Sequence, residues 1–88
     1  MNNTPIITVS VRDALVDVLG VDRATQALDA DDMIAAGLLD SFAIIEFAAR
    51  IEERLNVAIP TEALNQDSFR CHASVVAMVE SLKGAEGC

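Results

Sequence analysis

The side chains most able to do chemistry lie in one short run, Gly37-Leu38-Leu39-Asp40-Ser41-Phe42. Ser41 follows an acidic residue and opens a dense amphipathic segment that continues to Leu55, so we expect it at a helix N-terminus and partly exposed. A serine hydroxyl in that position can cap the helix, act as a nucleophile or accept a covalent modification. The unpaired backbone N–H groups and the dipole at a helix N-terminus favour an anion. A phosphodiester on Ser41 would therefore be well accommodated.

A hydrolytic role for Ser41 is not supported. Hydrolytic serines need a positioned base, and the only histidine, His72, falls at the predicted start of the last helix. No glycine motif for an oxyanion hole precedes Ser41, and the chain has no P-loop or dinucleotide-binding glycine pattern. We therefore expect no catalytic residue and no enzymatic activity.

A metal site is not expected either. Cys71 and His72 are adjacent, and adjacent residues seldom complete a tetrahedral shell without a second ligand pair. Asp29, Asp31 and Asp32 invite a calcium interpretation, but their spacing lacks the alternation, the central glycine and the terminal glutamate of an EF-hand. These aspartates are predicted to form a solvated acidic loop.

The run around Ser41 does not stand alone. Together with Ile45-Glu46-Phe47, Ile51-Glu52-Glu53-Arg54-Leu55 and Ile59-Pro60, it resembles the acyl carrier protein family. Within that family it is most similar to the stand-alone D-alanyl and aminoacyl carrier proteins. The resemblance extends from about Asp31 to Leu82 without gaps, over more than half of the chain.

The resemblance implies a carrier function. In that family the serine of an Asp-Ser-apolar triplet receives 4′-phosphopantetheine, so Ser41 is the expected attachment site. A phosphopantetheinyl transferase would move the arm from coenzyme A to Ser41, with Asp40 helping to orient metal and phosphate. An adenylating ligase would then load an acyl or aminoacyl group onto the arm as a thioester, and a downstream acyltransferase or synthase would receive it.

Two alternatives remain open from the sequence. The cargo is expected to be an amino acid or a short acyl group, but a fatty-acid or polyketide acyl carrier protein is the alternative within the family. The alternative of another class is a non-carrier acidic helical interaction module, in which Ser41 only caps a helix.

Composition bounds the fold. The chain has 88 residues, of which 52% are hydrophobic and only 3% aromatic. This predicts one all-α domain with an aliphatic core, a small acyl-carrier-like bundle of three main helices plus one or two short ones. We expect a lead-in at residues 1–7, the domain at 8–83 and a flexible tail at 84–88.

The net charge of −8 argues against nucleic-acid binding and favours steering toward basic patches on other proteins. The sequence shows no signal peptide and no apolar run long enough to span a bilayer, so we expect a cytoplasmic protein without membrane insertion. We also expect a monomer. Two cysteines, Cys71 and Cys88, form no disulfide framework and are interpreted as incidental.

Helical spacing of apolar residues predicts main helices near residues 8–19, 41–55 and 72–83. The long connection at 21–40 is expected to contain helical turns near 24–28 and 31–36, the second stopped by Gly37. A further turn is expected at Thr61–Leu64.

The predicted helix boundaries depend on a few residues. Pro5 is expected to precede the first helix, which would start at Thr8 or Ser10 and stop at Gly20. Asn65 is expected to cap a turn that continues through Phe69. The last helix is expected to open on Cys71-His72, where the family has Thr-Pro, and cysteine is a weak cap. Either that end frays or another group caps it.

The second main helix is predicted to have two faces. An apolar stripe is expected to face the core: Ile44, Phe47, Ile51 and Leu55. A second stripe contains Phe42, Ile45, Ala48, Ala49 and Glu52. Because matching positions serve carrier–enzyme recognition in the family, the resemblance implies a docking strip for partner enzymes around Ser41, formed by Asp40, Phe42, Ile45, Glu46, Ala49 and Glu53. The alternative is a solvated face with ordinary pairs such as Glu46 with Arg50. Arg50 and Arg54 depart from the more acidic helix of fatty-acid carriers.

Overall fold

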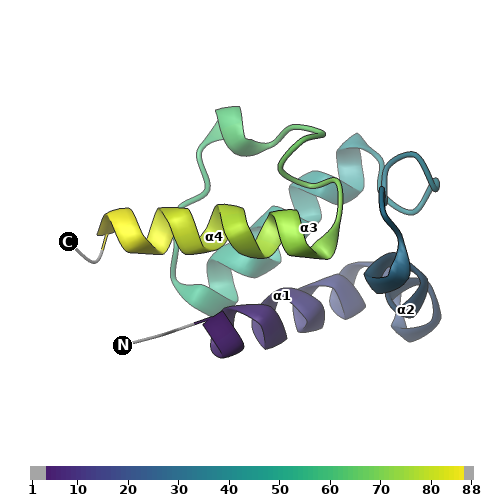
Figure 1. Ribbon diagram of the computed structural model, residues 1–88, viewed down its shortest axis with the longest axis horizontal. Coiled ribbons are helices and arrows are strands. Elements are labelled where there is room, and N and C mark those ends of the chain that lie inside the picture. The colour runs from purple at the N-terminus through teal and green to yellow at the C-terminus, as the bar shows by residue number, and fades with distance from the viewer. Residues whose placement is uncertain (1–3, 87–88) are drawn as a thin grey trace.

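The computed structural model describes residues 4–86 (Figure 1). Over that range the elements occur in the order α1 (Thr4–Leu19), α2 (Val21–Asp29), α3 (Ser41–Leu55), η1 (Thr61–Ala63) and α4 (His72–Glu86). No strand occurs among the described residues. The predicted all-α fold, with three main helices and short additional ones, is confirmed.

Helix α1 is the shared wall of the bundle, because it packs against each of the other three α-helices. Helices α1 and α4 run in opposite directions in Figure 1, while α2 closes one end of the molecule. The connection from α3 to α4 crosses above the helices and contains η1. Within residues 4–86, no helix combines the length and apolar character that crossing a membrane would require.

The core is aliphatic except at its centre, where two phenylalanines meet. Phe47 of α3 and Phe69 of the connection before α4 are both fully buried. Their ring centroids are 5.7 Å apart and their planes cross at 72°, an edge-to-face contact. Burying each ring contributes about 1.5–3 kcal/mol. This contact holds the connection down on α3.

Helix α1 begins earlier than expected. It starts at Thr4, so Pro5 lies in its first turn and does not precede it, and the predicted start at Thr8 or Ser10 is wrong. Proline is well tolerated in a first turn because the N–H it lacks would have no partner there. The predicted stop is confirmed, since Gly20 has φ +84° and separates α1 from α2.

The connection after α1 contains more helix than predicted. The turn expected near 24–28 is the full helix α2, which buries Ala24 and Ala27. The helical turn expected near 31–36 is a series of hydrogen-bonded turns at 33–37, which begins at the fully buried Met33. These turns end at Gly37, which has φ +79° as expected of a glycine stop.

The segment before α4 is ordered by side-chain caps. Asn65 Oδ1 accepts the N–H of Ser68 at 2.8 Å, which confirms the predicted turn. Ser74 Oγ accepts the N–H of Cys71 at 3.1 Å, as the third residue of a capping box does, and so helps to hold the start of α4. Helix α4 was predicted to end near residue 83 but continues to Glu86, so this predicted end is wrong. Residues 84–86 of the expected tail therefore belong to the helix. Cys88 lies outside the described residues.

Helix α3 has the predicted bounds, but its cap differs from the one expected. Asp40 is the N-cap: its backbone is extended (φ −114°, ψ −177°) and its Oδ1 accepts the N–H of Ala43 at 2.8 Å. Ser41 is the first helical residue, and its hydroxyl is not the cap. The prediction that Ser41 stands at a helix N-terminus is confirmed, while the capping role belongs to Asp40.

This geometry predicts which residue stabilises the start of α3. Asp40→Ala is expected to lower the free energy of unfolding by about 0.5–2 kcal/mol, because a cap is lost. Ser41→Ala is expected to change it by less than about 0.5 kcal/mol, as an exposed substitution. Asp40→Asn should match the wild type, since asparagine caps equally well. Urea unfolding followed by circular dichroism measures all three; a larger loss at Ser41 than at Asp40 would contradict the assignment.

His72 joins the start of α4 to α1. Its Nε2 lies 3.3 Å from the carbonyl oxygen of Thr8. Burial lowers the pKa of His72 below its usual value of 6.5, and Arg12 acts in the same direction, while the Thr8 carbonyl opposes them. The neutral imidazole is therefore favoured in the folded state.

The sign of the pH dependence follows. Because the unfolded histidine binds its proton at higher pH, the contribution of His72 is fully present above pH 6.5 and is lost as the pH falls through 6.5 toward the folded-state pKa. His72→Gln, which keeps a donor for Thr8, should lose less stability on acidification than the wild type. Urea unfolding at several pH values between about 5 and 7.5 tests this. Parallel pH profiles for the two proteins would refute it.

Candidate functional site

The Ser41 hydroxyl is exposed on the first turn of α3. Two of the four N–H groups at this helix start have partners: that of Ala43 donates to Asp40 Oδ1, and that of Ile44 donates to the Asp40 carbonyl at 2.9 Å. The N–H groups of Ser41 and Phe42 have no partner within the helix. An accessible hydroxyl thus lies beside free donors at the positive end of a helix dipole, where a phosphate is stabilised.

The chain immediately before Asp40 is held by backbone bonds. The carbonyl of the buried Met33 accepts the N–H of Leu38 at 2.9 Å and that of Leu39 at 3.2 Å. The Leu39 side chain is buried in the core. The position of Ser41 in the structure therefore depends on both sides, on the core-packed helix after it and on this loop before it.

A groove of about 310 Å³ opens beside Ser41. The residues that line it are Ser41, Ile44, Ile45, Thr61, Leu64, Asn65 and Gln66. The Asn65 side chain is fixed, because its Nδ2 donates to the Glu62 carbonyl at 2.6 Å and its Oδ1 holds the following turn. One wall of the groove is α3 and the second wall is formed by residues between 61 and 66. The sequence does not indicate this second wall. The turn at 61–64 and the cap at Asn65 are readable from the sequence, but their placement against Ser41 depends on long-range packing.

The predicted stripes of α3 separate largely as expected. The core stripe is buried: Ile44, Phe47, Ile51 and Leu55. On the outer side, Phe42 is 69% and Ile45 58% exposed, Ala49 and Glu53 are also exposed, and Glu46 is half-buried. These side chains do flank Ser41 on one helix. Their role in docking stays a prediction.

Two residues assigned to the outer stripe are placed differently. Ala48 is buried in the core. Glu52 is half-buried, and its Oε2 accepts the N–H of Ile59 at 2.8 Å, so its carboxylate orders the chain after α3. The same segment is fastened by Lys83, whose Nζ donates to the Leu55 carbonyl at 2.9 Å. Glu52 therefore has a structural partner and is not free to meet another protein.

The two arginines of α3 also differ. Arg54 Nη2 lies 2.6 Å from Asp17 Oδ2 and ties α3 to α1. Arg50 is exposed. Only one of the two basic residues is thus committed to an ion pair within the fold that the structure describes.

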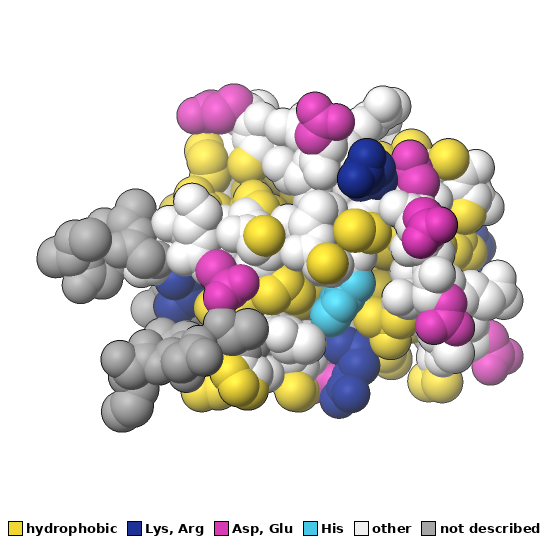
Figure 2. Space-filling model, viewed as in Figure 1, with side chains coloured by type: hydrophobic (Ala, Val, Ile, Leu, Met, Phe, Trp, Pro, Cys, Tyr) yellow, Lys and Arg dark blue, Asp and Glu magenta, His cyan; other side chains and the backbone are white. Residues whose placement is uncertain are grey.

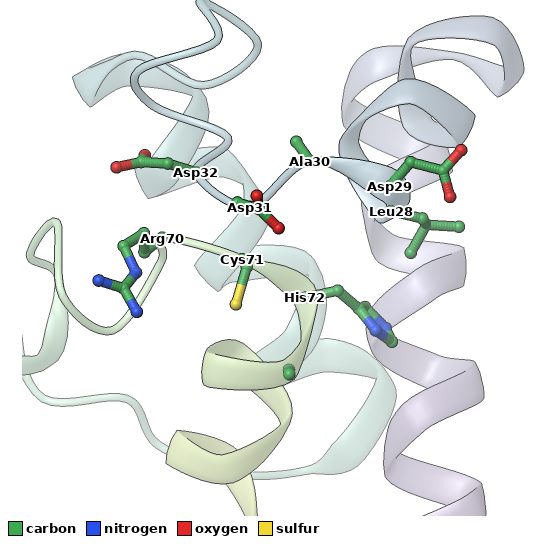
Figure 3. A pocket seen from close by; sticks show the side chains of 9 residues that line it. Leu28, Asp29, Ala30, Asp31, Asp32, Arg70, Cys71 and His72 are labelled. Atoms are coloured by element: carbon green, nitrogen blue, oxygen red, sulfur yellow. The ribbon is translucent and has the colours of Figure 1, made fainter.

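A larger pocket of about 660 Å³ lies at the other end of the 30–40 loop (Figure 3). Its lining includes Asp29, Asp31 and Asp32 on one side and Cys71 and His72 on the other. The carboxylates point in different directions in Figure 3, and Asp32 Oδ1 accepts the N–H groups of two following residues, each at 3.0 Å. Among the described residues no three such side chains gather to hold a metal ion.

Cys71 in this pocket has an altered acidity. The backbone N–H of Ser74 lowers the pKa of the Cys71 thiol below its usual value, and Arg70 contributes in the same direction. This is the expected effect of a helix N-terminus on a thiol.

On the face shown in Figure 2, acidic side chains gather at the end formed by α2 and the loop after it.

Comparison with known proteins gives a consistent picture. The family model for phosphopantetheine attachment sites matches residues 9–82. The chain is 39% identical over 67 residues to a D-alanyl carrier protein of Leuconostoc mesenteroides subsp. mesenteroides, which covers 76% of this chain and 83% of that protein. A D-alanyl carrier protein of Leuconostoc citreum is 34% identical over 79 residues, 85% of this chain and 99% of that protein.

A third relative, the D-alanyl carrier protein of Listeria monocytogenes serotype 4a, is 34% identical over 47 residues, which is 53% of this chain and 60% of that protein. No solved structure gives a significant match. The expectations of a carrier that is not itself an enzyme, and of 4′-phosphopantetheine as its cofactor, are confirmed by the family match. The chain belongs to the phosphopantetheine-attachment family of carrier proteins.

Proposed function

We propose that Ser41 bears the 4′-phosphopantetheine arm and that the chain presents an aminoacyl or short acyl group on it to partner enzymes. The observation that carries the proposal is the exposed Ser41 hydroxyl at the first position of α3, beside two backbone N–H groups without helical partners. A phosphodiester at Ser41 would meet these donors and the helix dipole. The hydroxyl therefore suits the phosphate end of the arm.

The attachment is a phosphoryl-group transfer from coenzyme A. Ser41 Oγ attacks the phosphorus next to the pantetheine, a new Oγ–P bond forms, and the P–O bond to adenosine 3′,5′-diphosphate breaks. The hydroxyl proton passes to a base on the transferase. Asp40 already caps Ala43 through Oδ1, and we propose that its charge also helps to orient the metal and phosphates during transfer.

The groove beside Ser41 supports a small cargo. The bound arm supplies a thiol on which an acyl group is held as a thioester. The groove volume, about 310 Å³, is at the lower end of the usual range for small-molecule sites. A long acyl chain would have to continue into a core already filled by Phe47 and Phe69. This disfavours the fatty-acid and polyketide alternatives.

The names of the relatives point in the same direction. Three of them are named D-alanyl carrier proteins, so D-alanine is the first cargo to test. The partner enzymes we propose are a phosphopantetheinyl transferase, an adenylating ligase for the amino acid and a downstream acyltransferase. Because coenzyme A and the ATP for adenylation are cytoplasmic metabolites, we place arm attachment and loading in the cytoplasm, on a monomeric carrier.

The test of this proposal is a mass measurement. The chain incubated with coenzyme A, magnesium and a transferase of broad specificity should gain the mass of one phosphopantetheine, and peptide mapping should place it on Ser41. Ser41→Ala should gain nothing while keeping its fold. Asp40→Asn, which preserves the cap, should be modified more slowly at unchanged stability.

Two controls test the attachment residue and the identity of the cargo separately. A modified Ser41→Ala protein would overturn the attachment site. The modified wild type should then accept D-alanine from an adenylating ligase, with a mass increase that hydroxylamine reverses. Efficient loading with a long fatty acid, and none with amino acids, would instead favour the fatty-acid alternative.

Partner docking gives a second prediction at the same helix. The strip formed by Asp40, Phe42, Ile45, Glu46, Ala49 and Glu53 begins beside Ser41 and continues along α3, so an enzyme that reaches the arm must approach it. Glu46→Lys should slow loading mainly at low salt, because steering by exposed charges is screened beyond about 8–10 Å at physiological salt. Ile45→Asp should weaken loading at every salt concentration, since apolar contacts dominate dissociation.

The matched control is Ile6→Asp on α1. Ile6 is 62% exposed, close to the 58% of Ile45, and the substitution adds the same charge. It should leave loading kinetics of fully modified protein within twofold of wild type, on the order expected for a remote surface change. Equal effects of Ile6→Asp and Ile45→Asp would show that net charge, and not this strip, governs recognition.

A further inference from the structure

The loop that leads to Ser41 reverses direction at Gly37. This residue has φ +79°, a left-handed conformation that side chains rarely adopt. Its N–H donates to the Ile34 carbonyl at 3.0 Å, and its own carbonyl accepts Nη2 of Arg23 at 3.2 Å. Arg23 lies on the exposed side of α2, so this bond connects α2 with the turn four residues before Ser41.

The two halves of the loop are held differently. In the first half, the N–H of the buried Met33 donates to the Arg70 carbonyl, and Asp32 holds the next two N–H groups. The second half, at 35–37, is exposed and has no apolar side chain in the core. Arg23 reaches this exposed half from outside the loop. Its removal would free the turn at Gly37 while leaving the Met33 anchor in place.

We infer that Arg23 is a positioning residue for attachment of the arm, an inference that rests on the proposed function of Ser41. The transferase must receive Asp40 and Ser41 in one arrangement. That arrangement follows from Leu38 and Leu39, whose N–H groups both donate to the Met33 carbonyl across the turn at Gly37. Arg23 favours the closed turn and so increases the fraction of free carrier that is ready to bind.

The expected size of the effect follows from the bond. A carrier that is ready for only a fraction of the time binds its partner with an affinity reduced by that fraction. A typical hydrogen bond corresponds to about a three- to tenfold shift in the equilibrium between the closed and the open turn, and the exposure of Arg23 keeps its bond within this range although the donor is charged. This shift is the upper limit of the change in affinity. The effect should appear in KM for the carrier, with kcat nearly unchanged, because the bound carrier has already closed its loop.

The experiment compares Arg23→Ala with Arg12→Ala, which removes the same charge from an exposed site on α1. Initial rates of phosphopantetheine transfer give KM and kcat for each full-length chain. Arg23→Ala should raise KM by more than about twofold and at most about tenfold, and Arg12→Ala should stay within about twofold of wild type. Arg23→Lys, which keeps a donor, should restore part of the loss.

Amide hydrogen exchange of the free carrier separates two explanations for a raised KM. Loss of a direct contact between Arg23 and the transferase would leave exchange in the free carrier unchanged, whereas opening of the loop would speed it. Arg23→Ala should speed exchange at the N–H groups of Leu38 and Leu39, with unchanged exchange in α1 and α3. A second variant reaches the same turn without touching Arg23. Gly37→Ala adds a Cβ that meets nothing within 4 Å, so it acts through backbone strain alone.

Gly20→Ala is the matched control for Gly37→Ala, since Gly20 has φ +84° and equally open space around its Cβ. Gly37→Ala should raise KM like Arg23→Ala, and Gly20→Ala should not. Equal kinetics of Arg23→Ala and Arg12→Ala would overturn the inference. So would a raised KM without faster exchange at Leu38 and Leu39, because Arg23 would then act by touching the transferase. Failure of the wild type to gain the arm on Ser41 would instead overturn the proposed function, and this inference with it.

Discussion

The hydrogen bond that caps α3 is the interaction on which the site depends, because the first turn of this helix must be exposed at one end and buried at the other. Its first residue faces water, while Ile44, one turn later, is buried. The bond from the Ala43 N–H to Asp40 Oδ1 makes this possible, because it ends the helix sharply at Ser41 and satisfies one of the exposed donors. The remaining free N–H groups are then concentrated at Ser41 and Phe42. A local capping bond thus leaves two backbone donors without helical partners beside the exposed Ser41.

The second wall of the site is a consequence of core packing. The edge-to-face contact of Phe47 with Phe69 draws the connection between α3 and α4 across the bundle. That placement brings Leu64 and the fixed Asn65 beside Ser41 and forms the groove. One apolar contact in the core thus helps to place both walls of the groove.

The features of this site that are set by local sequence patterns could be predicted, while those set by contacts between distant segments of the chain could not. The bounds of α3 and its buried stripe follow from apolar spacing, so both were predictable. The start of α1 was not, because Pro5 is compatible with a position before a helix and with its first turn. The cap was assigned to Ser41 because serine and aspartate are equally good caps and adjacent here. The groove and the Arg23 bond join segments that no local pattern connects.

The charges on α3 show the same interplay between fold and recognition. The sequence presents Arg50 and Arg54 as equivalent departures from an acidic helix. In the fold, Arg54 is paired with Asp17 of α1, so it adds little positive potential to the surface around Ser41. Glu52 is likewise occupied by the N–H of Ile59. What a partner meets is therefore set by the charges that the fold leaves unpaired, and Arg50 is the basic residue on α3 through which this carrier departs from a uniformly acidic strip.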